Sequence, residues 1–525
     1  MIDRRGVVIG ASLFAAAFAI RLVFAARLVF PPLDDPAFYI QTARNLAAGR
    51  GLVSDVLWNY FVSFPSVTHP SHEFWMPLAT LLMAVTIRLF GDTLPVAQLP
   101  GVLSGALLPV LTYALGRYLW PAQRRWGMLA ALPVMLGAIS VYQSGSADSA
   151  ALYALLSAGA LALAAVVVDG ARRMNLASAS PNAGQRAAPR FSIVVWGALG
   201  VGLLCGLSYL TRSHGSLLVA AIAPVWLIAR RCDFRRALIL VGTLAIGVLL
   251  IVGPWWWRNL QVFGALQPFP LTLAFAATDY GTWFNSVDLP SLQRLWAGGL
   301  EAVLQVRWAA LGHDLSVMGL VTFPFGVIGI PLLLVRREWL FRIFAMYAVL
   351  LWIVVSGVFP VPALTGSFYH SAGSIVPYAA LGGMAVIKAL AARPRWRLLS
   401  VGVYASLIAL VMGQSLLAWP GVWADSRSNQ TRFTAVAQWL RSNVPPDQPI
   451  ITNEAHSLNY ASGYPALTLP NQEDMAVVRQ LADRYGVHFI VVFGAIGLYP
   501  AALDQSTSAV RRATIGDVAV YEFQP

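Results

Sequence analysis

The chain has 525 residues, of which 58% are hydrophobic and only 11% are charged, and its mean hydropathy is +0.66. Soluble proteins carry roughly 25% charged residues, so this composition excludes an ordinary soluble domain and indicates a polytopic α-helical membrane protein. The net charge of +13 does not indicate nucleic-acid binding, because the arginines cluster between apolar segments as topology signals do.

Apolar runs near the roughly 20 residues that a bilayer requires recur along the first four fifths of the chain. The first follows "MIDRR" and has no small-residue cleavage site at its end, so we interpret it as a retained helix. We predict eleven membrane spans, near 6–30, 95–119, 127–143, 149–168, 192–211, 215–229, 237–254, 316–335, 343–360, 373–391 and 398–418.

Basic loops follow every second predicted crossing and fix the expected orientation. They lie at 124–125, 172–190, 230–236, 336–342 and 392–397, on the same side as the N-terminus. Because cytoplasmic loops are rich in Lys and Arg, this side is predicted to be cytoplasmic. The segment 74–90 is apolar enough to span, but counting it would put the later arginine clusters outside. We therefore interpret it as a helix at the outer interface, with an ordinary span as the alternative.

Two domains are predicted. Residues 1–419 form the transmembrane domain, whose first outer loop, 31–94, carries the interfacial helices. Residues 420–525 change character and predict a small α/β domain outside the membrane. In this tail "TRFTAVAQWLRSNVP" and "NQEDMAVVRQLADRYG" have helical periodicity, whereas "QPIITNE", "VHFIVVFG" and "VAVYEF" are typical of strands.

Asp34 and Asp35 lie just outside the first predicted span, in "PPLDDPAF". Carboxylates beside lipid and beside each other should have raised pKa values, which suits a general base. The alternative is that they simply cap the helix that follows.

Three potential metal ligands, His69, His72 and Glu73, lie together in "THPSHEF". Zinc binding is one interpretation, but the interrupting Pro70 favours a polar loop that touches substrate. No metal or other cofactor is expected, although a divalent cation is possible.

Further polar residues reach the predicted outer face from separate helices. Arginines there are unexpected under the positive-inside bias and suit a phosphate partner, the alternative being arginines that reach toward lipid headgroups. For Asp148, the one acid among these residues, capping of a helix is the alternative. The set is Asp148, Arg212, His214, Arg258, Asn259, Tyr369 and His370.

A carboxylate base with several cations beside lipid indicates a lipid substrate whose head is a phosphate. The main function predicted is therefore an enzyme acting on such a lipid. A flippase or transporter of lipid-linked sugars is one alternative, although transporters place polar residues near the membrane midplane. A non-catalytic accessory subunit that binds lipid-linked sugars is another.

From the first helix to about residue 390, the chain resembles the GT-C superfamily of integral-membrane glycosyltransferases. The resemblance is to the branch of protein mannosyltransferases and the bacterial aminoarabinose transferase of lipid A. It rests on four motifs in order: "DDPAFYIQTARNLAAGRGL", "THPSHEFWMPLATLLMAVTIRLFGDTLPVAQLP", a helix starting near Asp148, and "PWWWRNLQVFG".

The resemblance implies a bundle of about a dozen helices with an outer C-terminal domain. It also implies sugar transfer from a polyprenyl phosphate to a lipid, glycan or protein acceptor at the outer face of the bacterial inner membrane. The family's base is the first acid of a pair, and counting back from Tyr39 places it at Asp35, with Asp34 one place early. The second acid of the pair falls on Pro36, and the basic residue of the family's turn falls at His69. The expected reaction is one inverting displacement, with a phosphate leaving group held by Arg212 and Arg258 and with His69 as a further candidate for this role.

Overall fold

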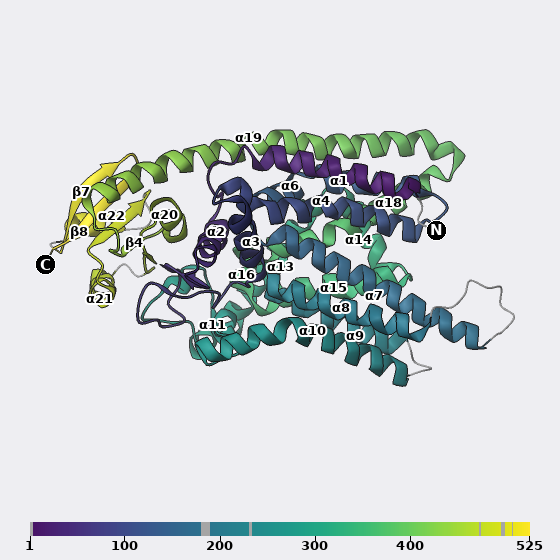
Figure 1. The fold of residues 1–525 in the computed structure, drawn as a ribbon, viewed down its shortest axis with the longest axis horizontal. Coiled ribbons are helices and arrows are strands. Elements are labelled where there is room, and N and C mark those ends of the chain that lie inside the picture. Colours follow the sequence, from purple (N-terminus) through teal and green to yellow (C-terminus); the bar gives the residue numbers. More distant parts are fainter. Residues whose placement is uncertain are drawn as a thin grey trace.

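The computed structural model describes residues 4–179, 190–229, 234–471, 474–494, 499–506 and 508–524. Parts of two predicted basic loops, 180–189 and 230–233, lie outside the described residues. The molecule is elongated, with the N-terminus at one end of a helical bundle and the C-terminal strands at the opposite end (Figure 1).

Within the described residues, eight helical segments are long and apolar enough to cross a membrane. They are α1 (Arg4–Ala25), α4 (Leu94–Leu119), α7 (Ala150–Ala179), α8 (Phe191–Thr211), α10 (Phe234–Phe263), α15 (Trp339–Trp352) with η3 (Ile353–Val358), α17 (Ser367–Ala372) with η4 (Gly373–Ile375) and α18 (Val376–Ala391), and α19 (Arg397–Asn443) with η5 (Pro394–Trp396). These helices pack through small residues: a Cβ added at Gly202 of α8 would lie 2.1 Å from the Leu244 carbonyl oxygen of α10.

Two further predicted spans are broken helix pairs. The pair α5 (Arg124–Leu136) and α6 (Ala138–Gly145) bends by 60°, and the pair α13 (Gly299–Thr322) and α14 (Phe325–Val335) bends by 111°. The straight span predicted at 316–335 is therefore wrong; Pro324, which cannot continue a helix, lies in the break. All eleven predicted segments fall on helices, but α9 (Ser216–Ala229), after η1 (Ser213–Gly215), is only 14 residues long.

Arg21 holds the bend between α5 and α6 from the neighbouring helix α1. A bend leaves carbonyl groups without intrahelical donors, and the guanidinium donates to the carbonyl oxygens of Val134 and Met135 at 3.2 Å each. It also donates to the hydroxyls of Ser140 and Ser144 at 3.1 Å each. This fully buried cation thus fixes the course of α6, which leads to Asp148.

The first loop folds against the end of the bundle that faces the C-terminal unit. It contains α2 (Asp34–Ala47), β1 (Val53–Ser54), β2 (Val56–Leu57), β3 (His69–Pro70) and α3 (Leu78–Phe90). With 13 residues, α3 is shorter than a membrane span, as an interfacial helix should be. A second loop follows α10 and contains α11 (Leu271–Ala276), η2 (Gly281–Phe284) and α12 (Leu292–Ala297); α16 (Pro360–Leu364) precedes α17.

The C-terminal segment forms a small α/β unit. Its strands are β4 (Ile450–Thr452), β5 (Ala466–Thr468), β6 (Phe489–Phe493), β7 (Ala509–Ile515) and β8 (Val518–Phe523), and its helices are α20 (Ala455–Ser462), α21 (Met475–Tyr485) and α22 (Tyr499–Gln505). The sheet order is β2-β5-β4-β6-β8-β7, so a strand from the first loop completes the sheet, parallel to β5.

The tail elements expected from the sequence are confirmed, but α19 is continuous across the predicted domain boundary at 419/420. This 47-residue helix runs along the bundle and continues into the C-terminal unit (Figure 1), where its last turns pack against the sheet. Because α19 and β2 both join the two parts, the C-terminal unit is built onto the first loop rather than tethered to it.

Candidate active site

A cavity of about 400 Å³ lies between the bundle, the first loop and the C-terminal unit. Asp34 and Asp35 line it from the first turn of α2, where the positive end of the helix dipole stabilises carboxylates. The N-cap of α2 is Leu33, without a side-chain hydrogen bond, so neither aspartate performs the capping role that the sequence left open. Both carboxylates are therefore available to the cavity.

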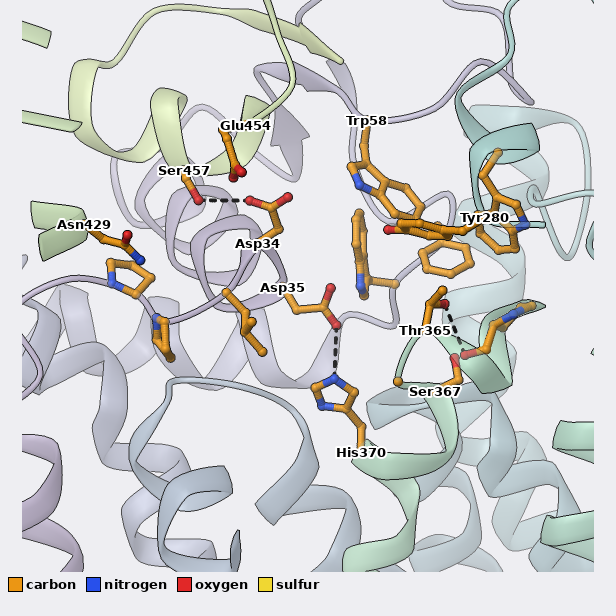
Figure 2. Close-up of a pocket in the computed structure, with 18 of the residues that line it drawn as sticks. Asp34, Asp35, Trp58, Tyr280, Thr365, Ser367, His370, Asn429, Glu454 and Ser457 are labelled. Atoms are coloured by element: carbon orange, nitrogen blue, oxygen red, sulfur yellow. Dashed lines mark hydrogen bonds and ion pairs between the residues drawn. The ribbon is translucent and has the colours of Figure 1, made fainter. Parts of the chain in front are cut away.

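The two carboxylates point in different directions (Figure 2). The Asp35 Oδ2 lies 4.0 Å from Nε2 of His370, which comes from α17. Asp34 Oδ1 instead accepts a hydrogen bond of 2.9 Å from the hydroxyl of Ser457 in α20, with Glu454 beside it. Asp34 thus contacts the C-terminal unit, whereas Asp35 contacts the helical bundle.

Asp148 completes a group with Asp35 and His370, which we call the Asp35 cluster (Asp35, Asp148 and His370). Asp148 lies in the turn between α6 and α7, and its Oδ2 is 2.6 Å from Nδ1 of His370. Ala147 in this turn has φ 59°, a conformation that is unfavourable for a residue with a Cβ and that the surrounding packing must hold.

The carboxylates of the cavity differ in proton affinity. Burial raises the pKa of Asp35, and Asp148 adds to the rise, while His370 and Arg212 oppose it. Burial raises the pKa of Asp34 to about 6, against the hydrogen bond from Ser457 and with the help of Asp35. Burial would also raise the pKa of Asp148, but His370 and Arg212 together hold it well below its usual range. The pKa of Asp148 is thus lowered and that of Asp35 raised, so Asp35 takes up a proton more readily than Asp148 does.

Arg212 lies where this cavity meets a second one of about 110 Å³. Its Nη1 donates to the hydroxyl of Ser149 at 2.9 Å, while its buried Nε has no hydrogen-bond partner. An orphaned guanidinium donor at the junction of two cavities is suited to an oxyanion. The second cavity is also lined by Tyr39 and His214, and His214 Nδ1 lies 2.8 Å from the Ser371 hydroxyl.

Of the "THPSHEF" residues, His69, His72 and Glu73 line neither cavity, whereas Phe74 lines both. His69 stacks on Phe64 with ring centroids 3.9 Å apart, and its Nε2 lies 3.7 Å from Glu73. His72 Nε2 lies 3.0 Å from the Thr80 hydroxyl. The three residues are buried in the first loop, away from both cavities, and their predicted contact with substrate stays a prediction.

Arg258, Asn259 and Tyr369 are likewise outside the linings of both cavities. The Arg258 guanidinium lies over the rings of Trp255 and Phe263, at 4.8 and 5.0 Å. Asn259 donates to the Leu266 carbonyl oxygen at 3.0 Å, and the Tyr369 ring packs edge-on against His370. Arg258 thus packs on aromatic rings at the end of α10, and its predicted contact with phosphate stays a prediction.

The sequence did not predict that residues of the C-terminal unit and the second loop line the larger cavity. These residues carry no motif and become neighbours of the aspartates only through the fold. They are Tyr280, Trp283, Asn429, Arg432, Glu454 and Ser457. Burial raises the pKa of Glu454 to about 7; Asp34 adds to this rise and Arg432 opposes it.

The Asp35 cluster is also the group of potential metal ligands that converges within the described residues, in place of His69, His72 and Glu73. One ligand atom from each member lies within 4.8 Å of the others. Ligands that share one octahedral ion at about 2.1 Å are roughly 3 Å apart. The closer contact between His370 and Asp148 would have to open before an ion could enter.

Three solved structures share the architecture. ArnT from Cupriavidus metallidurans bound to undecaprenyl phosphate matches with a TM-score of 0.53 at 14% identity, over 98% of this chain and 97% of that chain. Its apo state matches with a TM-score of 0.56 at the same identity and coverage. The archaeal oligosaccharyltransferase AglB from Archaeoglobus fulgidus, in complex with an inhibitory peptide and a dolichol-phosphate, matches with a TM-score of 0.50 at 11% identity, over 91% of this chain and 69% of that chain.

No protein-family model and no curated protein matches the chain by sequence. The relation is therefore one of architecture, and it extends over nearly the whole of this chain. The fold expected from the four motifs is confirmed: the chain shares the fold of these solved membrane proteins.

Proposed function

We propose that the protein is a glycosyltransferase that moves a sugar from a polyprenyl-phosphate donor to an acceptor hydroxyl. The observation that carries this proposal is the placement of a protonatable carboxylate and an incompletely bonded guanidinium, Asp35 and Arg212, on the walls of one cavity. The lipids bound in the neighbour structures, undecaprenyl phosphate and dolichol-phosphate, support the same class of donor.

Arg212 is assigned to the phosphate. The smaller cavity beside it has mostly apolar walls, including Phe269, Leu271 and Phe359, which suit the first isoprene units of the lipid. The guanidinium fork matches phosphate oxygens and stabilises the charge that develops as the phosphate leaves. His214 lines the same cavity and is a second candidate for contact with the phosphate.

Asp35 is assigned as the general base. It takes the proton from the acceptor hydroxyl, the hydroxyl oxygen bonds to the anomeric carbon, and the bond from that carbon to the phosphate oxygen breaks. The electron pair of the broken bond leaves with the polyprenyl phosphate. One such displacement inverts the sugar configuration. The raised pKa of Asp35 suits this role, since a base works best when its pKa approaches the working pH.

His370 positions the base. It lies between Asp35 and the anionic Asp148, which fixes the imidazole from the Nδ1 side. Since this direct pairing occupies the space where an ion would bind, we propose transfer without an obligatory divalent cation. If a cation does take part, the Asp35 cluster would hold it and it would supply positive charge beside the leaving phosphate.

The test uses undecaprenyl phosphate as the probe and undecaprenol, which lacks the phosphate, as its control. The wild-type protein in lipid nanodiscs should bind the phosphate lipid, and Arg212→Ala should weaken that binding. Asp35→Asn should bind it normally and yet fail to transfer from a panel of polyprenyl-phosphate sugars. Equal binding of undecaprenol and undecaprenyl phosphate would contradict the proposal.

We further propose that the N-terminus and the basic loops face the cytoplasm and that the C-terminal unit lies outside, which places the cavity at the outer face. In a background without native cysteines, Arg337→Cys in a basic loop should resist an impermeant thiol reagent added to intact cells. Ser442→Cys near the end of α19 should react. Reaction of both positions, or of Arg337→Cys alone, would refute this orientation.

A further inference from the structure

A third cavity, of about 310 Å³, lies between α5, α14 and α18, away from the Asp35 cluster. Its volume is at the lower end of the range for small-ligand sites, roughly 300–1,000 Å³. Arg125 lines it from α5, Arg336 from the end of α14, and Lys388 from the last turn of α18. The remaining walls are mainly Trp120, Trp126 and alanines.

The positive charge in this cavity exceeds the negative charge beside it. None of its lining residues is acidic. Arg336 pairs with Glu338, whose Oε2 lies 3.0 Å from the Arg336 Nε. Lys388 and Arg125 instead lie over tryptophan rings: the Lys388 Nζ is 5.5 Å from Trp120, and the Arg125 Cζ is 5.1 Å from Trp126.

A structural explanation covers part of this arrangement. Lys388 complements the negative end of the α18 dipole, and arginines are common in loops on one side of a membrane. Neither effect requires cations from three helices to line one enclosed space. Lys388 is moreover half-buried, and no carboxylate of the described residues forms an ion pair with it. An anion in the cavity would supply the missing partner.

The cavity also lies at one end of a membrane-spanning segment. His370 and Lys388 are at opposite ends of the α17–α18 segment, roughly 27 Å apart along the helix axis. The cavity is therefore at the end of the bundle opposite the Asp35 cluster. Trp120 and Trp126 are of the residue type that lies at the level of lipid headgroups.

We propose that this cavity, lined by Arg125, Arg336 and Lys388, binds a phosphate-bearing anion, namely the headgroup of an anionic phospholipid. Basic pockets between membrane helices are suited to such headgroups. The adjoining apolar surface of the helices would lie along the acyl chains. This site is separate from the donor site and does not depend on the proposed transfer reaction.

The experiment titrates the purified full chain in non-ionic detergent with a short-chain phosphatidylglycerol and follows the melting temperature and the binding heat. Short-chain phosphatidylcholine and inorganic phosphate are the comparison ligands. Phosphatidylglycerol should bind saturably and raise the melting temperature. Lys388→Gln and Arg125→Gln should each weaken its binding about fivefold, the typical effect of one basic residue on anionic lipid.

Arg393→Gln is the matched control. Arg393 is exposed in the neighbouring loop and does not line the cavity, so this variant removes the same charge and should bind the lipid as the wild type does. An equal loss in the Arg393 variant would reduce the effect to general charge attraction and overturn the proposal. So would unchanged binding in both cavity variants, which lie on different helices. If inorganic phosphate binds as tightly as phosphatidylglycerol, the phosphate site stands but its ligand is free phosphate.

Discussion

Asp35→Asn should lower the transfer rate by roughly 10²–10⁴, the usual effect of losing a general base. Asparagine keeps the size and the planar geometry of the side chain but cannot take a proton from the acceptor. The carboxylate of Asp35 faces the cavity, and its Oδ2 lies 4.0 Å from His370 Nε2. The substitution should leave the fold and the binding of donor intact, because donor binding is assigned to Arg212.

Asp34→Asn is the matched comparison, because it makes the same chemical change one residue away. Asp34 bonds Ser457 of the C-terminal unit, and the Oδ1 of asparagine can still accept that hydrogen bond. The substitution therefore removes only the negative charge of the acceptor in one hydrogen bond. This should cost about 1 kcal/mol, or roughly fivefold to tenfold in the transfer rate. The structure thus predicts a gap of at least tenfold between the two variants.

The assay is single-turnover transfer from a panel of polyprenyl-phosphate sugars by purified protein in lipid, with undecaprenyl phosphate binding measured on the same samples. Matched binding guards against mistaking misfolding for lost chemistry. An inactive Asp34→Asn with an active Asp35→Asn would exchange the two roles. Full activity in both would leave the carboxylates as stabilisers of the α2 N-terminus and remove the main support for an enzyme.

Three further predictions follow from the site. Arg212→Ala should weaken donor binding by about 1.5–3 kcal/mol in an equilibrium titration, whereas Arg258→Ala, outside both cavities, should have a much smaller effect; the reverse order would move the phosphate site to α10. Transfer should persist in excess EDTA, and complete loss restored by Mn²⁺ or Mg²⁺ would instead assign a cation to the Asp35 cluster. Glu454 has a folded-state pKa of about 7 against an ordinary value of 4.5, so its ionisation should destabilise the wild type as pH rises through this window. The melting temperature of Glu454→Gln should therefore rise relative to that of the wild type between pH 4.5 and 7, whereas that of the exposed control Glu301→Gln should not. If the melting temperatures of Glu454→Gln and the wild type instead change in parallel with pH, burial does not raise the pKa of Glu454.

The sequence by itself determined where the helices lie and which acids are unusual. Apolar runs must become helices in lipid because backbone groups find no water there, and this is why all eleven predicted segments fall on helices. The placement of Asp34 and Asp35 against the first span was visible because charged residues beside hydrocarbon are rare. The alternation of the tail likewise predicted strands β4, β6 and β8.

Only the tertiary structure decided which polar residues share a site. Asp148 and His370 are 222 positions apart, and Ser457 is 423 positions from Asp34, so no local pattern links them. The sequence placed both Arg212 and Arg258 at the predicted outer face, and packing then separated them. Arg212 lines the cavity and has a buried Nε without a hydrogen-bond partner, while Arg258 lies over two aromatic rings. The same holds for β2, whose two residues carry little strand signal and pair with β5 because the first loop is held against the C-terminal unit. Hydrophobicity is a property of each segment and can be recognised in sequence, whereas a site depends on distances between segments, which the packing of the whole chain sets.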